Sequence, residues 1–304
     1  MDEITVQVGG HVTLLFSIHS DSILPRNQGS KGVGLCLEHG VQSTVSISDK
    51  DEIEISTVIE KPVSYNSELY SDLLNSFRDL FNIDSNVRIE LSLELPISQG
   101  FGMSAAGLLS TSLALGQLFD KGDEGQLARL AHRIERKHSS GLGDILGLWA
   151  GGCGLRTFPG SPPYPGKVSS FPVGSPALLV WDLDSSKHTS HYINDKVWKQ
   201  SITLAGDACV NRLKRQNWGV NIWPSLLNEA DNFANFSGLL SEPEREKLYT
   251  TVKEMMDENM SSHLCMLGTS LIIVPKEIGS QIDFSSLATS LNSLGYGTVQ
   301  TFIQ

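Results

Sequence analysis

Positive charge is scarce in this sequence of 304 residues. Lysine and arginine total 23 against 34 aspartates and glutamates, which gives a formal net charge of −11, and no cluster of five basic residues occurs. Nucleic acid and anionic membrane are therefore poor partners, because both attract basic patches. No run of about 18 apolar residues occurs either, so no membrane-spanning helix is predicted.

Cysteine is also rare and shows no pairing pattern. Cys36, Cys153, Cys209 and Cys265 lie far apart and form neither a CxxC pair nor a Cys/His zinc pattern. A reducing compartment is the economical interpretation. The first residues, MDEITV, are acidic where a signal peptide needs a basic start. We therefore expect a cytoplasmic protein.

Two familiar nucleotide-binding motifs are missing. GxxxxGK[ST] occurs nowhere, and its nearest match, GSPPYPGKV, has five residues between the glycines and valine in place of the hydroxyl. The GxG that begins at Gly100 has no third glycine at the offset of a dinucleotide fingerprint. A phosphate site in this chain must therefore be built in another way.

The most informative stretch is PISQGFGMSAAGLL, which begins at Pro96. Apolar and polar residues alternate upstream, over 87–95, as in a strand with one buried face. Pro96 ends that strand because it has no N–H, and Gly100 and Gly102 let a bulky anion come close. An apolar helix starts at Ser104, where free amide groups favour phosphate. From the residues alone, the stretch could also be an ordinary tight turn that binds no phosphate.

The rest of the chain predicts interleaved strands and helices. Toward the amino terminus we expect a strand over 4–8, a turn at GGH, an apolar stretch over 12–18, a glycine-rich loop over 20–34, and a hairpin of 40–47 with 52–59. Helices are expected over 69–81, from Ser104, over 126–138 and from Asp144. A region rich in proline, glycine and serine over 158–176 indicates a domain boundary. Beyond it, strands over 177–182, 271–274 and 298–303 and helices over 194–217, 224–236, 243–259 and 284–294 fit an α+β domain.

PISQGFGMSAAG resembles the second conserved motif of the GHMP kinases, P-x-x-x-G-[LF]-G-S-S-A-A. The residues in register are Pro96, Gly100, Phe101, Gly102, Ser104, Ala105 and Ala106, and Met103 stands where the commoner motif has its first serine. The resemblance implies that these residues, Met103 included, bind ATP. It also implies that Ser104 helps to hold Mg²⁺ on the nucleotide.

A second resemblance involves Glu135 and Asp144. By themselves, Glu135 fits a solvated helix face and Asp144 a helix cap. In mevalonate-kinase-like members of the family, a helical Glu that binds Mg²⁺ precedes a glycine turn with the catalytic Asp, and a Gly-Gly pair follows. Here Asp144 comes nine residues after Glu135, and Gly151 seven residues after Asp144. This implies Asp144, Glu135 and Ser104 as catalytic residues, with Ser104 and Glu135 as Mg²⁺ ligands.

Within this family the amino-terminal half is most similar to the archaeal pantoate kinase branch. The shared features are GHVTLLF, QGSKGVG, GFGMSAAG, AHRIE and the arginine of LRTFPG, whereas Gly9 and Lys31 depart from the usual proline and arginine. The resemblance implies transfer of the ATP γ-phosphoryl group to the 4-hydroxyl of (R)-pantoate, for coenzyme A biosynthesis. It implies substrate contacts at Ser30, Lys31, His132 and Arg156.

The resemblance also implies the fold. It is a two-domain α+β GHMP kinase fold, with residues 1–172 as an α+β domain containing a left-handed βαβ unit and residues 173–304 as a ferredoxin-like α+β domain. A homodimer is expected. The third family motif is reduced to MLGTS at 266–270. The alternatives are another small-molecule kinase of the homoserine or mevalonate type, a diphosphomevalonate decarboxylase, and a non-catalytic ligand-binding protein on a decayed kinase fold.

Overall fold

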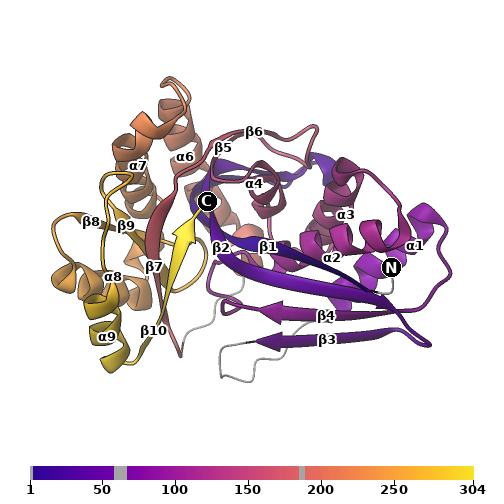
Figure 1. Cartoon of the computed structure of the whole chain (residues 1–304). Coiled ribbons are helices and arrows are strands. Elements are labelled where there is room, and N and C mark those ends of the chain that lie inside the picture. The colour runs from indigo at the N-terminus through magenta and orange to yellow at the C-terminus, as the bar shows by residue number, and fades with distance from the viewer. Residues whose placement is uncertain (1–2, 58–66, 185–188) are drawn as a thin grey trace.

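The chain is a mixed α+β structure, as predicted. The computed structural model describes residues 3–57, 67–184 and 189–304, and in this part of the chain strands form one mixed sheet flanked by helices (Figure 1). The strands are β1 (Glu3–His19), β2 (Gly29–Ile47), β3 (Glu52–Thr57), β4 (Val87–Leu93), β5 (Cys153–Phe158), β6 (Lys167–Phe171), β7 (Ser175–Asp182), β8 (Met260–Leu264), β9 (Ser270–Pro275) and β10 (Tyr296–Ile303).

The helices come from both halves of the chain. They are α1 (Glu68–Phe81), α2 (Met103–Phe119), α3 (Glu124–Lys137), α4 (Asp144–Ala150), α5 (Thr189–Asn194), α6 (Lys196–Leu213), α7 (Trp223–Phe236), α8 (Pro243–Met255) and α9 (Ser285–Ser293), with short 3-10 turns at Pro25–Asn27, Val220–Ile222 and Leu239–Ser241. Among the described residues, none of these helices is both long and apolar enough to span a membrane.

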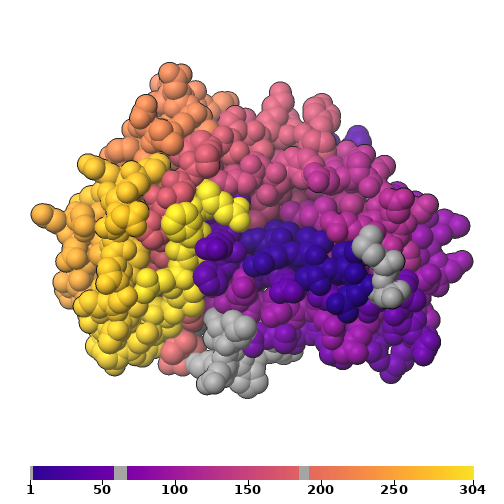
Figure 2. All heavy atoms as spheres, in the orientation of Figure 1, coloured from indigo at the N-terminus to yellow at the C-terminus, as the bar shows by residue number. Residues whose placement is uncertain are grey.

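The sheet has two parts that meet at one point. Its main path runs β3-β4-β2-β10-β7-β9-β8, with β1 paired to β2, and β5 bridging β2 and β6. The strands β2 and β10 share a single residue pair, Leu37 with Ile303. Figure 2 shows the two halves of the chain side by side, with the indigo strands of the amino-terminal half next to the yellow carboxyl end. The division of the chain at residue 172 stays a prediction.

The predicted hairpin of 40–47 with 52–59 is wrong. Strand β4 lies between β2 and β3, pairing antiparallel with β2 and parallel with β3. The alternating apolar residues of both segments are real, but strand alternation does not reveal which strand is the neighbour. Residues 58 and 59 lie outside the described residues. β3, α1 and β4 thus form a βαβ unit with parallel strands, and the predicted left hand of that unit stays a prediction.

The glycine-rich amino-terminal segments are strands rather than a turn and a loop. Strand β1 continues through the predicted GGH turn, where a register shift between Gly9 and His11 marks a bulge. Strand β2 already starts at Gly29, so only residues 20–28 of the predicted 20–34 loop are a connection. Glycines in a strand often mark a bulge or a close approach of another backbone, and both occur here. β8 was not predicted, because its MSSHL sequence has little apolar periodicity.

Helix α2 lies at the centre of the amino-terminal half. Most of its side chains are buried between Met103 and Gly116, because β1 and β2 cover it on one side and α1 and α3 on the others. A helix that is apolar all round is stable only in such an interior. This burial fixes the position of the glycine loop that precedes α2. Helix α3 begins with a capping box between Asp123 and Gln126.

Candidate active site

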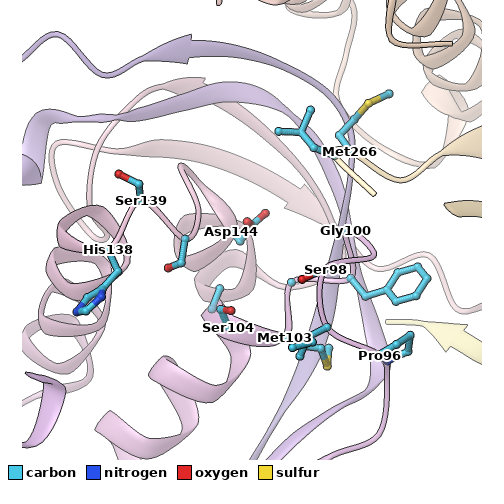
Figure 3. A pocket seen from close by; sticks show the side chains of 15 residues that line it. Pro96, Ser98, Gly100, Met103, Ser104, His138, Ser139, Asp144 and Met266 are labelled. Atoms are coloured by element: carbon cyan, nitrogen blue, oxygen red, sulfur yellow. The ribbon is translucent and has the colours of Figure 1, made fainter. Parts of the chain in front are cut away.

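Two cavities meet at the side chain of Asp144. The loop cavity is lined mainly by residues 96–105 and 138–140, and the arginine cavity by Thr13, Phe16, Ser30, residues 141–143 and Arg156. Asp144, Met266 and Leu267 line both. Figure 3 shows Ser104 and Asp144 among the side chains that line the loop cavity, with the ring of His138 pointing away from both. Asp144 is therefore in a position to act between two different ligands.

The loop cavity is built largely from backbone. Gly102 caps α2 with a left-handed φ of 71°, and an ideal Cβ on it would lie 2.9 Å from both the backbone N and O of His11. The amide of His11 in turn donates to the carbonyl of Phe101 at 2.9 Å. Only glycine fits here, because a side chain would meet both positive-φ strain and a backbone. The loop is thereby fixed to β1, with the amino terminus of α2 facing the cavity.

The carboxyl-terminal half closes the loop cavity through residues 265–270. The hydroxyl of Ser270 donates to the carbonyl of Gln99, and Gly268 packs against the same residue so closely that a Cβ would overlap it. On the far side, the buried guanidinium of Arg245 donates to the carbonyls of Leu267 and Gly268. The shortened MLGTS segment thus lies against the glycine loop.

Glu135 is a buried carboxylate without a hydrogen-bond donor. Its side chain is 1% exposed, and neither oxygen accepts a hydrogen bond among the described residues, although His132 Nδ1 lies 3.5 Å from Oε2. The Glu135 carboxylate and Asp144 Oδ2 lie beside the same space, the one that a side chain on Gly141 would fill. Arg136 keeps this turn in place by donating to the carbonyl of Gly141. A buried, unpartnered carboxylate is costly unless a cation or donor completes the site.

Asp144 is held by a closed ring of hydrogen bonds. The Nδ1 of His11 lies 2.7 Å from Asp144 Oδ1, and the hydroxyl of Thr13 donates to the same oxygen at 3.2 Å. Arg156 completes the ring, with NH1 3.2 Å from His11 Nε2 and NH2 3.3 Å from the Thr13 hydroxyl. Among the described residues, none donates to Asp144 Oδ2. One carboxylate oxygen is therefore fixed and the other is available to a ligand.

The ring also sets the charges at the site. Burial by itself would raise the pKa of Asp144, but the hydrogen bond from His11 and the charge of Arg156 hold that pKa below its usual value. Burial lowers the pKa of His11, and this outweighs the opposing effect of Asp144. Asp144 is thus a carboxylate and His11 a neutral imidazole at neutral pH.

The structure separates the predicted substrate residues into two groups. Ser30 and Arg156 are buried and line the arginine cavity. Lys31 and His132 do not line it. The ammonium group of Lys31 pairs with Asp207 at 3.1 Å, and His132 Nε2 lies 3.1 Å from the carbonyl of Gln28. Consecutive residues of a strand point to opposite faces, which is why Ser30 and Lys31 diverge.

Sequence reasoning did not assign a role to His11 or Thr13, both of which contact Asp144. A signal for both was present in GHVT, which carries a histidine and a hydroxyl two residues apart on one face of a strand. Met266 and Leu267 belong to the MLGTS segment, the reduced third family motif, and line both cavities.

Comparisons with known proteins identify similar sequences and a similar fold. Residues 68–152 match the family "GHMP kinases N terminal domain". A solved structure described as "Phosphotransferase related to CoA biosynthesis pathway" superposes with a TM-score of 0.77 at 24% identity, over 99% of this chain and 96% of that one. Residues 68–152 thus resemble the amino-terminal domain of the GHMP kinases, and the whole chain shares the fold of this phosphotransferase.

Two proteins of known function are similar to this chain in sequence. The chain is 34% identical over 167 residues to the pantoate kinase of Methanospirillum hungatei, a match that covers 53% of this chain and 55% of that protein. It is 23% identical over 273 residues to the pantoate kinase of Methanocaldococcus jannaschii, covering 88% of this chain and 91% of that protein. The match to the first relative thus spans about half of its length.

Proposed function

We propose that this protein is a pantoate kinase, which transfers the γ-phosphoryl group of ATP to the 4-hydroxyl of (R)-pantoate. The observation that carries the proposal is the meeting of the two cavities at Asp144. One cavity is a backbone loop at a helix start, which suits phosphates, and the other contains a buried arginine, which suits an acid. The pantoate kinase relatives support the choice of acceptor.

The arginine cavity matches the chemical groups of pantoate. Pantoate carries a carboxylate, two hydroxyls and a dimethyl carbon. Arg156 offers a cation for the carboxylate, and the hydroxyls of Ser30 and Thr13 are suited to the polar groups. The apolar lining residues that suit the dimethyl group are Phe16, Leu142, Met266 and Leu267. Lys31 and His132 were also predicted as substrate contacts, but they do not line this cavity, so any effect on pantoate would be indirect.

In the proposed reaction the 4-oxygen of pantoate bonds to the γ-phosphorus as the bond to the β,γ-bridging oxygen breaks, leaving ADP and 4-phosphopantoate. Asp144 Oδ2 holds the hydroxyl in line and accepts its proton. Two hydrogen bonds fix Asp144 Oδ1, so the carboxylate is well placed to align the hydroxyl. A loose phosphoryl-transfer transition state needs alignment and charge neutralisation more than an early base.

Mg²⁺ is the cofactor that the site fits. The unpartnered carboxylate of Glu135 lies beside Asp144, and Ser104 stands at the start of α2 in the loop cavity. Among the described residues no cluster of three metal-ligating His, Cys, Asp or Glu side chains occurs. Mg²⁺ on a nucleotide needs only one or two protein ligands, since phosphates and water supply the rest. Ser104 and Glu135 would hold the ion, which neutralises charge on the β- and γ-phosphates.

A panel of acceptors tests this function. The purified protein is mixed with ATP, Mg²⁺ and pantoate, pantothenate, homoserine, mevalonate or shikimate, and ADP release is measured. We expect pantoate to be much the best acceptor. Faster transfer to homoserine or mevalonate would refute the substrate assignment, and no ADP release with any acceptor would favour a non-catalytic protein.

We also propose a cytoplasmic homodimer. The location is supported by the four cysteines, which are all free and buried. The dimer is implied by the family resemblance. Size-exclusion chromatography with light scattering tests the dimer, and a mass near 33.1 kDa would identify a monomer.

A further inference from the structure

We propose that His11 is a positioning residue that fixes the catalytic carboxylate, as a neutral imidazole protonated only at Nδ1. The proposal goes beyond the proposed function and depends on it only for the role of Asp144. The two ring nitrogens of His11 have different partners. Nδ1 faces Asp144 Oδ1 at 2.7 Å and Nε2 faces Arg156 NH1 at 3.2 Å.

The identity of these partners determines the tautomer. A guanidinium has only donors, so Nε2 must accept from Arg156 and therefore carries no hydrogen. The single ring proton then lies on Nδ1, which donates it to Asp144. A histidine protonated on both nitrogens would present a donor to a donor. Arg156 thus acts on Asp144 through His11, and in parallel through the Thr13 hydroxyl, which accepts from Arg156 and donates to Asp144.

The surroundings of the ring leave it little freedom. The residue is 1% exposed. Gly34 and Gly147 pack against the ring from two elements, and a Cβ on either would overlap Nε2. The charged groups that face His11 are Asp144 of α4, Arg156 of β5 and Glu135 of α3. A ring confined in this way cannot rotate or flip, so the direction of its Nδ1–H bond is fixed.

His11 also connects the two cavities. Its backbone N–H donates to Phe101 of the glycine loop at 2.9 Å, while its side chain holds Asp144. One residue of β1 therefore sets the position of the carboxylate relative to the phosphate loop. Reacting atoms misplaced by about 1 Å can cost about 10²-fold in rate. The expected contribution of His11 is to kcat, since His11 is not among the residues that line either cavity.

A pair of substitutions at this one position tests the proposal. The amide of asparagine reaches the place of Nδ1, and that of glutamine the place of Nε2. His11→Asn keeps the donor to Asp144, whereas His11→Gln keeps only the acceptor for Arg156. We expect kcat to fall less than about tenfold in His11→Asn and about 10²-fold in His11→Gln, with both KM values within about threefold. A His11→Gln variant with kcat equal to or above that of His11→Asn would overturn the proposal.

Thr13 offers an independent check if position 11 does not tolerate change. Thr13→Ser keeps the bridging hydroxyl and Thr13→Val keeps the shape without it. We expect Thr13→Val to lower kcat at least fivefold more than Thr13→Ser, with circular dichroism unchanged in both. Equal kcat in the two folded variants would contradict the closed ring of hydrogen bonds.

A readout without turnover separates this proposal from the proposed function. In protein labelled with ¹⁵N-histidine, two-bond ¹H–¹⁵N spectra distinguish the ring nitrogens, and the His11→Asn spectrum identifies the signal among eight histidines. We expect the His11 proton on Nδ1. A proton on Nε2, or on both nitrogens at pH 7, would overturn the proposal whatever the acceptor. Failure of every acceptor with an Nδ1–H signal intact would instead refute the proposed function alone.

Discussion

The two cavities on either side of Asp144 are built from different materials. The loop cavity depends on backbone, with a glycine loop fastened to β1 and to residues 265–270. The arginine cavity depends on buried side chains that hold one another, above all Arg156 with His11 and Thr13. A backbone site should tolerate many side chains but few changes of glycine. A side-chain site should be sensitive to every partner, since removing one leaves another buried and unpaired.

The largest effect is expected at Asp144, which belongs to both cavities. Asp144→Asn keeps the size of the side chain but removes its charge, and loss of a general base costs about 10² to 10⁴ in turnover. Circular dichroism should be unchanged, and steady-state kinetics give kcat. Near-normal turnover in the folded variant would reduce Asp144 to a helix cap.

Arg156 should show how sensitive the side-chain site is. Arg156→Ala removes the cation of the arginine cavity and the donor to His11 and Thr13. We expect kcat/KM for pantoate to fall by about 2 to 5 kcal/mol, at least about 30-fold, because a partner of a buried charged pair is lost. Arg156→Lys should recover little, since lysine lacks the planar fork.

The KM for ATP provides the contrast for Arg156. It should stay within about threefold, because the proposed phosphate site is on the loop side. Arg212 is a matched control, as it pairs with Glu229 at 2.7 Å but is 44% exposed. Arg212→Ala should change pantoate kinetics by at most about 1 kcal/mol. An unchanged pantoate KM in both Arg156 variants would refute the carboxylate role.

A substitution of Glu135 tests whether Mg²⁺ binds beside the loop cavity. Glu135→Gln removes the charge of the unpartnered carboxylate, and we expect the affinity for Mg²⁺ in the presence of ADP to fall about 10- to 100-fold. Calorimetric titration of Mg²⁺ into protein with ADP measures this without turnover. A folded variant that binds Mg²⁺ like the wild type would exclude Glu135 as a ligand.

Gly102 tests the backbone site. Gly102→Ala places a Cβ 2.9 Å from the backbone of His11 at a φ of 71°. Gly174→Ala is the control, because Gly174 has a φ of 60° but nothing within 4 Å of its Cβ position. Both should lose about 1 to 2 kcal/mol of unfolding free energy from the left-handed conformation, and Gly102→Ala should lose more because its Cβ also meets the His11 backbone. Only Gly102→Ala should raise the KM for ATP, by about tenfold. Equal ATP kinetics would contradict the backbone contact.

The smallest effect is expected at Lys31. Its ammonium group is paired with Asp207 on α6 and does not line the arginine cavity. Lys31→Ala should change the KM for pantoate by at most about fivefold, or 1 kcal/mol, the usual range for an ion pair in contact with solvent. If Lys31→Ala lowered kcat/KM for pantoate as much as Arg156→Ala does, Lys31 would have to contact the substrate.

Much of the fold was predictable because it depends on local pattern. The alternation upstream of Pro96, the apolar helix from Ser104 and the helix that carries Glu135 were all predicted, and each of them forms. The pairing of β3 with β4 was not predictable. Periodicity shows that a segment is a strand, but the choice of neighbour depends on contacts between distant segments.

The sequence by itself determined the glycine loop and the order of Ser104, Glu135 and Asp144, because these lie in short motifs whose chemistry is local. Only the tertiary structure decided how Asp144 is held. His11 and Arg156 lie 145 residues apart in the chain, yet their side chains meet at 3.2 Å because β1 and β5 both pair with β2. Hydrogen-bond partners that are brought together by strand pairing have no characteristic spacing in the sequence. Their roles can therefore be seen only when the pairing of the strands is known.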